Sequence, residues 1–494
     1  MAPTEHSVHA DESEEADKLI CSQCVGEAFL SNVIEQSGFK MTCSYCSERG
    51  PCWSIEGLAE SIEKAFEDHY VRTSTSPESW QERLQADKES DYEWEREGYP
   101  VVDAIEGAAS IPREAAEDVL ERLANKYARY DKDYVGVETE FSAGSYYEEK
   151  GVDPGGWQRE WRWFERSLKS EARFFSKAAA GHLSSVFGGI DKIRTRGGRG
   201  IVVNAGPGRG IKRLYRARVF LSDNRLEEAL CRPDIHLGSP PGRIASSGRM
   251  NARGISVFYG ATAPGAAIAE VRPPVGSKVA VAQFEIVLPL RLLDLTTIEQ
   301  AEVFGSIFDP SFKNRLERVA FLQSLGQMMT RPVMPDDEAL DYLATQAVAD
   351  FLATENEPPL DGIIYRSVQT RGGRNVVLFH KAARVAELQL PNGTTVSARS
   401  FIDSDDGPEV DYWVWEEVPK ESGSKTPTKD QFLHDILFSD YPSESGWDDR
   451  EPALRVDPAS VSVHWIDWVS VRSTKHDVAR HRVVKPDPSQ EPKF

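Results

Sequence analysis

The spacing of apolar residues divides the chain into a helical first half and a strand-rich second half. Between residues 54 and 191, apolar side chains recur every three or four positions, as at Ile55, Leu58 and Ile62, which is the period of an amphipathic helix. Aromatic residues mark a further helix across Trp157–Phe175, and aromatics at such spacing are expected to pack in a core. The first half is therefore predicted to be all-α.

From Lys212 onward the apolar runs become short and rich in β-branched residues, as expected for strands. The predicted strands are Leu214–Phe220, Ile255–Tyr259, Val279–Val287, Gly362–Tyr365 and Val376–Phe379, and later Val410–Val418 and Val461–Val471. Helices are predicted across Pro264–Val271, Ser311–Gln327 and Asp337–Leu352. This mixture predicts an α+β domain. A polar insert around residues 420–429 is expected to be mobile.

Two C-x2-C pairs near the N-terminus predict a metal site. Cys21 and Cys24 form the first pair, and Cys43 and Cys46 form the second. Each pair can turn two thiolates toward one ion, and two such knuckles complete a closed, structural four-sulfur zinc site. Cys52 lies outside both pairs and is expected to be a free thiol.

Composition narrows the classes of function. With 58 Lys and Arg against 79 Asp and Glu, the net charge is −21, which argues against non-specific nucleic-acid binding. The most apolar stretch, Val279–Leu295, is interrupted by polar residues and is too short to span a bilayer. The acidic start lacks the pattern of a secretory signal, and five of the 6 cysteines cluster near it. These features favour a reducing cytoplasm.

Three polar clusters interrupt the apolar runs of the second half. They are Tyr215-Arg216 in an alternating strand, the Gly- and Arg-rich segment Gly248–Gly254, and the loop Tyr365–Asn375 with its Ser and three internal Arg residues. Glycine lets a ligand approach the backbone, and arginine binds phosphate oxygens with two parallel hydrogen bonds. The clusters therefore indicate an anionic ligand.

These clusters resemble the RES domain, a family named for its Arg, Glu and Ser. The resemblance covers about Lys212–Lys381 and rests on Tyr215-Arg216, Gly248-Arg249-Met-Asn251-x-x-Gly254, Ser256–Ala261, Ala269-Glu270, Tyr365-Arg-Ser367 and Gly-Gly-x-Asn375. The cysteine knuckles and helices resemble the HEPN-like N-terminal domain that accompanies some RES domains. Arg173 and His182 are too far apart for the HEPN ribonuclease motif, so RNA cleavage by this half is not expected.

The resemblance implies a fold similar to ADP-ribosyltransferases and diphtheria toxin, and an enzyme that uses NAD as its substrate. Such a NAD phosphorylase or NAD glycohydrolase breaks the nicotinamide-ribose bond, with inorganic phosphate or water as the acceptor. As nicotinamide leaves, positive charge develops on the ribose, and a fixed carboxylate can stabilise it. The residues implicated as catalytic are Arg216, Arg249, Tyr259, Glu270 and Ser367, and those implicated in substrate binding are Asn251 and Asn375.

The resemblance also implies a role for each residue. Glu270 would hold the ribose, Arg216 and Arg249 would bind the diphosphate or incoming phosphate, and Tyr259 would contact the nicotinamide or orient the ribose. Ser367 would hydrogen-bond a phosphate or ribose oxygen. Purely structural interpretations remain open, in which Tyr259 serves only in the core, Ser367 only as the cap of a turn, and Glu270 only as an ordinary exposed glutamate.

Domain boundaries follow from these patterns. We expect an acidic flexible tail at 1–18, a zinc knuckle at 19–54, a helical HEPN-like domain at 55–191, a RES catalytic domain at 200–390 and a C-terminal extension at 391–494. RES toxins are typically neutralised by a small antitoxin protein, whereas here the N-terminal half is a candidate regulator. Whether the chain forms a homo-oligomer is left open. The alternatives are a mono-ADP-ribosyltransferase and a nucleic-acid-sensing module with a degenerate RES domain.

Overall fold

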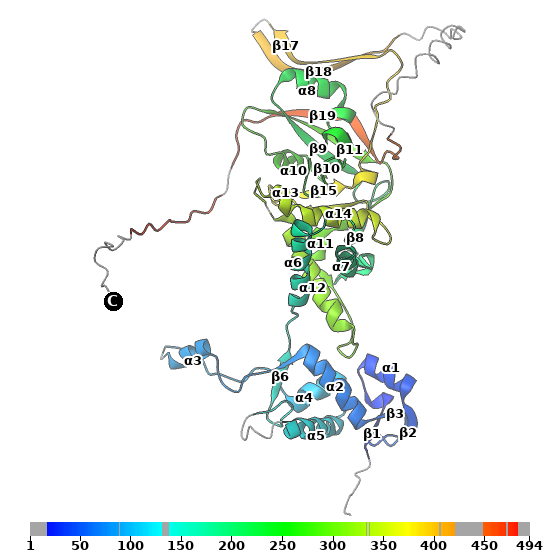
Figure 1. Ribbon diagram of the computed structural model, residues 1–494, viewed down its shortest axis with the longest axis vertical. Helices are drawn as coiled ribbons and strands as arrows, with labels where there is room; N and C mark the ends of the chain where they lie inside the picture. Colours follow the sequence, from blue (N-terminus) through cyan, green and yellow to red (C-terminus); the bar gives the residue numbers. More distant parts are fainter. Residues whose placement is uncertain are drawn as a thin grey trace, which may run out of the picture. The chain divides into compact units, whose positions relative to one another are not determined.

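The computed structural model describes residues 17–87, 89–130, 138–331, 333–334, 336–404, 407–419, 448–470 and 473–482 (Figure 1). The expected acidic tail, apart from its last two residues, and the expected mobile insert around residues 420–429 lie outside the described residues. The chain forms two compact units, one from residues 1–203, 248–251 and 291–365 and the other from 204–247, 252–290 and 366–494. No described helix is both long and apolar enough to cross a membrane.

The first unit begins with a small sheet around the paired cysteines. Its strands are ordered β1 (Leu19–Cys21), β3 (Arg49–Ser54) and β2 (Phe39–Thr42). A 3-10 helix (Ser22–Cys24) and helix α1 (Ala28–Ser37) follow β1. The Glu27 side chain caps α1 by accepting a hydrogen bond of 2.8 Å from the Leu30 N–H.

Three helices then build one apolar core: α2 (Ile55–His69), α4 (Val101–Ala109) and α5 (Arg113–Tyr130). The predicted stripe Ile55, Leu58 and Ile62 is fully buried in it. Helix α3 (Ser79–Ala86) is largely exposed. The all-α prediction is wrong, because a sheet of three strands lies beside these helices, ordered β4 (Tyr70–Arg72), β6 (Tyr146–Glu149) and β5 (Tyr99–Pro100). Strands of two to four residues are too short to show an alternating pattern.

The aromatic helix of the first half packs against helices from much later in the chain. It is α6 (Gly155–Ser170), and with α7 (Lys177–Phe187) it adjoins α12 (Phe312–Thr330) and α14 (Leu343–Thr354). Trp157 and Trp161 lie 6.1 and 5.8 Å from the buried Phe321 ring of α12. Because α6 ends at Ser170, Phe174 and Phe175 are exposed, and the expectation that they belong to the core is wrong.

The remaining elements of the first unit are short. Parallel strands β12 (Leu290–Asp294) and β14 (Gly362–Arg366) pair with Leu292 opposite Gly362, and β7 (Arg194–Thr195) pairs with β13 (Ala301–Glu302). The other helices are α11 (Leu295–Ile298), α13 (Glu338–Asp341) and a 3-10 turn at Ile190–Lys192. Strand β8 (Val202–Ala205) occupies the stretch where the chain passes from one unit to the other.

The second unit is built on six neighbouring strands. Their order is β16 (Val385–Ala386), β19 (Leu454–Trp465), β11 (Lys278–Ile286), β9 (Arg213–Phe220), β10 (Phe258–Ala261) and β15 (Arg374–Leu378). All neighbours are antiparallel except β16 and β19. The predicted strand Ile255–Tyr259 begins only at Phe258, and the predicted strand Val461–Val471 coincides with β19 only as far as Trp465.

Helices and a hairpin complete the second unit. Helix α10 (Pro264–Glu270) covers one sheet face, where Ala266 and Ala267 pack with Ala217, Ala261 and Val281. The unit also contains two further helices and two 3-10 turns. They are α8 (Asp223–Cys231), α9 (Pro233–His236), Gly242–Ile244 and His380–Ala382. The long hairpin of β17 (Thr395–Ser404) and β18 (Gly407–Glu417) packs on α8, and β18 contains most of the predicted strand Val410–Val418.

Candidate functional site

The structure brings together the four paired cysteines. Cys21 ends β1, Cys24 ends the 3-10 helix, and Cys43 and Cys46 follow β2. Their four sulfur atoms lie within 4.8 Å of one another, with Cys21 and Cys46 3.6 Å apart and Cys24 and Cys43 3.8 Å apart. Zinc-sulfur bonds of about 2.3 Å give tetrahedron edges of about 3.8 Å, so the four thiols fit a closed zinc site.

Backbone donors prepare one of these sulfurs to be a ligand. Burial alone would raise the pKa of the Cys43 thiol, but N–H groups of Tyr45, Cys46 and Cys21 lower it to about 7. A thiolate is the form that binds zinc. The Tyr45 hydroxyl also donates a hydrogen bond of 2.7 Å to Asp118 of α5, which joins the knuckle to the helical core.

In the second unit, a carboxylate and a buried amide meet at the end of α10. Glu270 is the last residue of this helix and is exposed. The amide nitrogen of Asn375, a residue of β15 that is only 2% exposed, donates a hydrogen bond of 2.9 Å to Glu270 Oε2. Register explains the meeting, because Asn375 lies opposite Ala261, the residue that ends β10 shortly before α10 begins. The amide thereby orients the carboxylate.

The Ser367 loop packs beside the same helix. Ser367 N–H donates to the Gly373 carbonyl at 2.8 Å, and Ser367 Oγ accepts from the N–H groups of Gln369 and Thr370 at 3.2 and 3.3 Å. Ser367 therefore caps a turn, which is one of the two interpretations that the sequence leaves open. A Cβ at Gly373 would lie 3.2 Å from the Cβ atoms of Ala266 and Ser367, so glycine allows the loop to approach α10 closely.

Two polar atoms in this region are buried and have no hydrogen-bond partner among the described residues. They are the side-chain oxygens of Asn375 (Oδ1) and Thr370 (Oγ1). A buried polar atom left unpaired costs about 1–3 kcal/mol, so such atoms need an explanation. Donors of a bound ligand, such as ribose hydroxyls or a carboxamide, would satisfy them.

Arg216 presents a desolvated cation. Its guanidinium carbon lies 5.2 Å from the centre of the Phe258 ring, and its Nη1 atom is buried without a partner among the described residues. Burial first, and then the nearby Arg218, lower the pKa of Arg216 to about 10, while the Tyr259 phenol partly opposes this shift. Arg216 therefore stays protonated at neutral pH, and a bound anion would stabilise its positive charge.

Strand register separates the expected residues of this unit between two faces. Tyr215 lies opposite Ala261, and Ala261 lies opposite Asn375, so these three share the face that α10 covers. Tyr259 lies on that face too, whereas Arg216 leaves β9 on the opposite one, because side chains alternate along a strand. The structure thus gathers Glu270, Asn375 and the Ser367 loop around α10 but directs Arg216 to the other face.

Arg249 and Asn251 belong to the first unit. Arg249 Nη1 donates to the Met329 carbonyl at 3.0 Å, and its guanidinium carbon lies 5.0 Å from the centre of the Tyr342 ring. Asn251 is buried, and its carbonyl accepts a hydrogen bond of 3.0 Å from the Gln346 side chain. Both residues are therefore held by helices α12–α14 and the segment that joins them.

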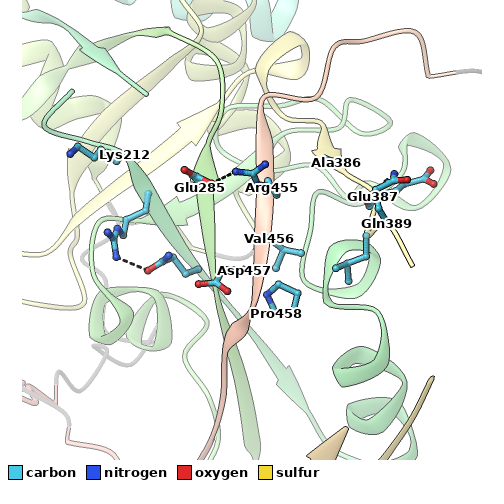
Figure 2. Close-up of a pocket in the computed structure, with 12 residues that line it drawn as sticks. Lys212, Glu285, Ala386, Glu387, Gln389, Arg455, Val456, Asp457 and Pro458 are labelled. Atoms are coloured by element: carbon cyan, nitrogen blue, oxygen red, sulfur yellow. Dashed lines mark hydrogen bonds and ion pairs between the residues drawn. The ribbon is translucent and has the colours of Figure 1, made fainter. Parts of the chain in front are cut away.

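The second unit also contains a cavity that sequence analysis missed (Figure 2). It has a volume of about 680 Å³ and is lined by Lys212, Arg213, Gln283, Glu285, Ala386, Glu387, Leu388, Gln389, Arg455, Val456, Asp457 and Pro458. Figure 2 shows Glu285 and Arg455 joined across neighbouring strands, at 2.6 Å. None of the residues implicated by the resemblance lines it. Its signal in the sequence was the alternating polar pair Gln283 and Glu285 in an otherwise apolar strand.

The cavity and the α10 cluster lie along one row of paired residues. Gln283 is opposite Tyr215, whose hydroxyl donates to its side-chain oxygen at 3.3 Å, and the row continues through Ala261 to Asn375. Three strand spacings separate Gln283 from Asn375, which amounts to about 14 Å. The cavity is therefore a separate feature from the α10 cluster.

Comparison with known families finds a match in the second half of the chain. Residues 215–400 match the model of the RES domain, and the matched segment contains all seven residues that the resemblance implicates. No curated protein and no solved structure matches the chain. The chain thus has a segment similar to a RES domain at residues 215–400, after an N-terminal part with a four-cysteine cluster suited to zinc. The HEPN-like resemblance stays a prediction.

Proposed function

We propose that the protein is an enzyme that degrades NAD by cleaving its nicotinamide-ribose bond, by phosphorolysis or hydrolysis. The observation that carries the proposal is the Glu270 carboxylate, oriented by buried Asn375 within the segment that matches the RES domain. In the cell the enzyme would act as a toxin or defence effector that its N-terminal half regulates.

The position of Glu270 suits this chemistry and gives its own helix no benefit. A carboxylate at the C-terminal end of a helix faces the negative end of the helix dipole, which is unfavourable. Departure of nicotinamide leaves positive charge on the ribose, and a pre-oriented carboxylate stabilises that charge without reorganising in the transition state. Asn375 supports this role by holding one carboxylate oxygen while the other stays available for a ribose hydroxyl.

Arg216 stays in the proposal as a ligand of the substrate's diphosphate on the resemblance, although it leaves β9 on the face opposite the α10 cluster. It is a protonated guanidinium with a buried, unpartnered nitrogen, and planar arginine binds phosphate oxygens with two parallel hydrogen bonds. Arg249 and Asn251 stay in the proposal as further substrate-binding groups, on the resemblance alone. Tyr259 is proposed to contact the nicotinamide or the ribose.

The acceptor is proposed to be phosphate or water rather than an enzyme nucleophile. Ser367 Oγ already accepts two backbone hydrogen bonds, so this oxygen is poorly suited to attack the ribose. Its hydroxyl hydrogen can still be donated to a ligand oxygen. In the reaction the bond from ribose C1 to the pyridinium nitrogen breaks, and nicotinamide leaves with that electron pair. An oxygen of phosphate or water bonds to C1, and water, when it is the acceptor, loses a proton to the solvent.

Product analysis tests the proposal. Purified full-length protein is incubated with NAD, with and without inorganic phosphate, and nicotinamide, ADP-ribose and ADP-ribose-1″-phosphate are quantified. Phosphate-dependent formation of the phosphorylated sugar identifies a phosphorylase, and ADP-ribose without phosphate identifies a glycohydrolase. Absence of nicotinamide release from both the full-length protein and a chain that lacks the N-terminal domain would overturn the proposal.

A further inference from the structure

Arg272 follows the end of α10 in a backbone conformation that residues other than glycine rarely adopt. Its φ is 45°, in the left-handed region, and its N–H donates to the Ala269 carbonyl at 3.1 Å, which closes a turn at the helix end. Glycine is the usual residue at this position after a helix, because it has no Cβ. The following Pro273 restricts the backbone of Arg272 further. Such a strained position points to a function for the side chain that occupies it.

The guanidinium of Arg272 reaches the Ser367 loop. With the Gln369 amide oriented so that its oxygen faces the guanidinium, this oxygen accepts hydrogen bonds from Nε and Nη2 of Arg272, both at 3.1 Å. The Gln369 N–H in turn donates to Ser367 Oγ at 3.2 Å. The guanidinium is thus held at the loop that packs beside α10, and Arg272 is two residues past Glu270 in the chain.

The partner of Arg272 is neutral. Among the described residues Arg272 forms no ion pair, and both Arg272 and Gln369 are exposed. The edge of the guanidinium that carries Nε and Nη2 can bind two oxygens of a phosphate, and a charged acceptor forms stronger hydrogen bonds with it than an amide oxygen does. The contact with Gln369 therefore holds the side chain in place without neutralising its charge.

The two segments that meet here are basic apart from Glu270. Residues 366–374 contain three arginines and no Asp or Glu, and residues 261–275 contain Glu270 as their one acidic residue. This excess of positive charge attracts an anion to the contact between the two segments. Arg216 cannot serve the same place, because it leaves β9 on the opposite face of the sheet.

We propose that Arg272 binds a phosphate group at the α10 cluster, by exchanging its contact with Gln369 for one with two phosphate oxygens. The inference rests on the proposed NAD cleavage and adds to it a phosphate-binding residue on the Glu270 side of the sheet. Both the diphosphate of NAD and an inorganic phosphate acceptor offer such oxygens. A role in ending α10 alone would not need a guanidinium, since glycine ends a helix at this position with less strain.

Binding of ADP-ribose and of inorganic phosphate to the full-length protein tests the proposal, because neither probe requires NAD cleavage. Equilibrium dialysis with the radiolabelled compounds gives both dissociation constants. Arg272→Gln is expected to raise the constant for ADP-ribose at least tenfold, as for the loss of a charge-assisted pair of hydrogen bonds. Arg225→Gln is the matched control, because Arg225 of α8 is exposed and forms no ion pair among the described residues. It should change neither constant.

The two probes also identify which phosphate Arg272 binds. A raised constant for ADP-ribose assigns Arg272 to the diphosphate of the substrate. A raised constant for inorganic phosphate, with ADP-ribose unaffected, assigns it to the acceptor. Unchanged constants for both, or a wild type that binds neither probe, would overturn the proposal. Loss of binding in Arg272→Gln, in a protein whose wild type leaves NAD intact, would contradict NAD cleavage but not phosphate binding.

Two further variants separate phosphate binding from a purely structural role. Gln369→Ala removes the internal contact but keeps the guanidinium, so it should retain most of the affinity that Arg272→Gln loses. Arg272→Gly relieves the backbone strain, so it should keep or raise the melting temperature while it loses that affinity. Equal losses of affinity in Arg272→Gln and Gln369→Ala would show that Arg272 acts only by holding the loop, and would overturn the proposal. So would full affinity for both probes in Arg272→Gly.

Discussion

At the residue scale, Glu270 and Asn375 show how a catalytic assignment can be separated from a structural one. Glu270→Gln keeps an oxygen that can accept from the Asn375 amide but removes the negative charge. We expect unchanged folding and a fall of about 10²- to 10³-fold in NAD cleavage, the size typical for the loss of one preorganised electrostatic contact. Nicotinamide release and the melting temperature measure the two effects.

Glu228→Gln supplies the control for this prediction, because Glu228 is an exposed glutamate on α8. Its substitution should leave both quantities unchanged. Full activity in Glu270→Gln would move the charge-stabilising role to another residue.

At Arg216 we expect the stability of the fold and the binding of NAD to make opposite demands on the side chain. Because one buried guanidinium nitrogen, Nη1, has no hydrogen-bond partner among the described residues, the apolar replacement Arg216→Met should stabilise the fold by about 1–3 kcal/mol while weakening NAD binding. Thermal unfolding with and without NAD measures both effects. NAD should raise the melting temperature of the wild type but not that of the variant. Lower stability of Arg216→Met would mean that the guanidinium contributes more than it costs.

The individual residues of the site could be named from the sequence, but their contacts could not. Glu270 and Asn375 are 105 positions apart, and only the register of β10 with β15 makes them neighbours. The turn capped by Ser367 was one of two open interpretations, and the structure supports it. The face of Arg216 was unforeseen, because alternation along β9 gives relative sides but does not say which side α10 covers.

At the element scale, the cysteine knuckle is the least self-sufficient part of the first unit. Its three-stranded sheet has few buried side chains, so metal binding should supply most of its stability. Removal of zinc with a chelator is expected to raise amide hydrogen exchange in β1–β3 at least about tenfold, and in α5 less, through loss of the Tyr45–Asp118 hydrogen bond. Tyr45→Phe should reproduce only the effect on α5. Unchanged exchange after complete metal removal would contradict a structural zinc.

The ion pair of α9 gives a pH prediction. Burial would raise the pKa of Asp234, but hydrogen bonds from Arg232 and the Leu388 N–H lower it below its ordinary value of 3.8. Its stabilising effect is thus fully present above 3.8 and disappears as pH falls through the lowered value. Asp234→Asn should lower the melting temperature by a constant amount between about pH 8 and 5, and the difference should shrink below about pH 4. A difference that grows on acidification would show the opposite sign.

Elements with many periodic residues were predicted well, and short ones were not. Helices α2 and α5 and strands β9 and β11 follow patterns of eight or more residues. The sheet β4–β6–β5 escaped notice, because two of its strands pair through two or three residues each. The predicted aromatic helix extends past Ser170, where α6 ends. The spacing of aromatic residues does not by itself mark the end of a helix when no capping residue is present.

At the scale of the whole molecule, the first unit joins helices from both halves of the sequence. Phe321 of α12 is fully buried beside Trp157 and Trp161 of α6, and Arg318 of α12 donates to the Val186 carbonyl of α7 at 3.0 Å. The link between α12 and the N-terminal domain is smaller, with the Lys313–Asp68 ion pair at 2.8 Å as one contact. Truncation of the chain before α6 should therefore lower its stability less than truncation after α7.

Two truncated proteins test this organisation together with the proposed regulation. A chain that starts at residue 152 keeps α6 and α7 and should fold, whereas one that starts at residue 190 exposes Phe321 and should aggregate or melt at a lower temperature. If the N-terminal domain restrains the enzyme, the chain from 152 will deplete cellular NAD faster than the full chain. The same Glu270→Gln substitution in the shorter chain should abolish that gain. Equal NAD depletion by the folded shorter chain and the full chain would show that the N-terminal domain does not restrain the enzyme. Because the shorter chain keeps α6 and α7, loss of these helices could not explain such a result.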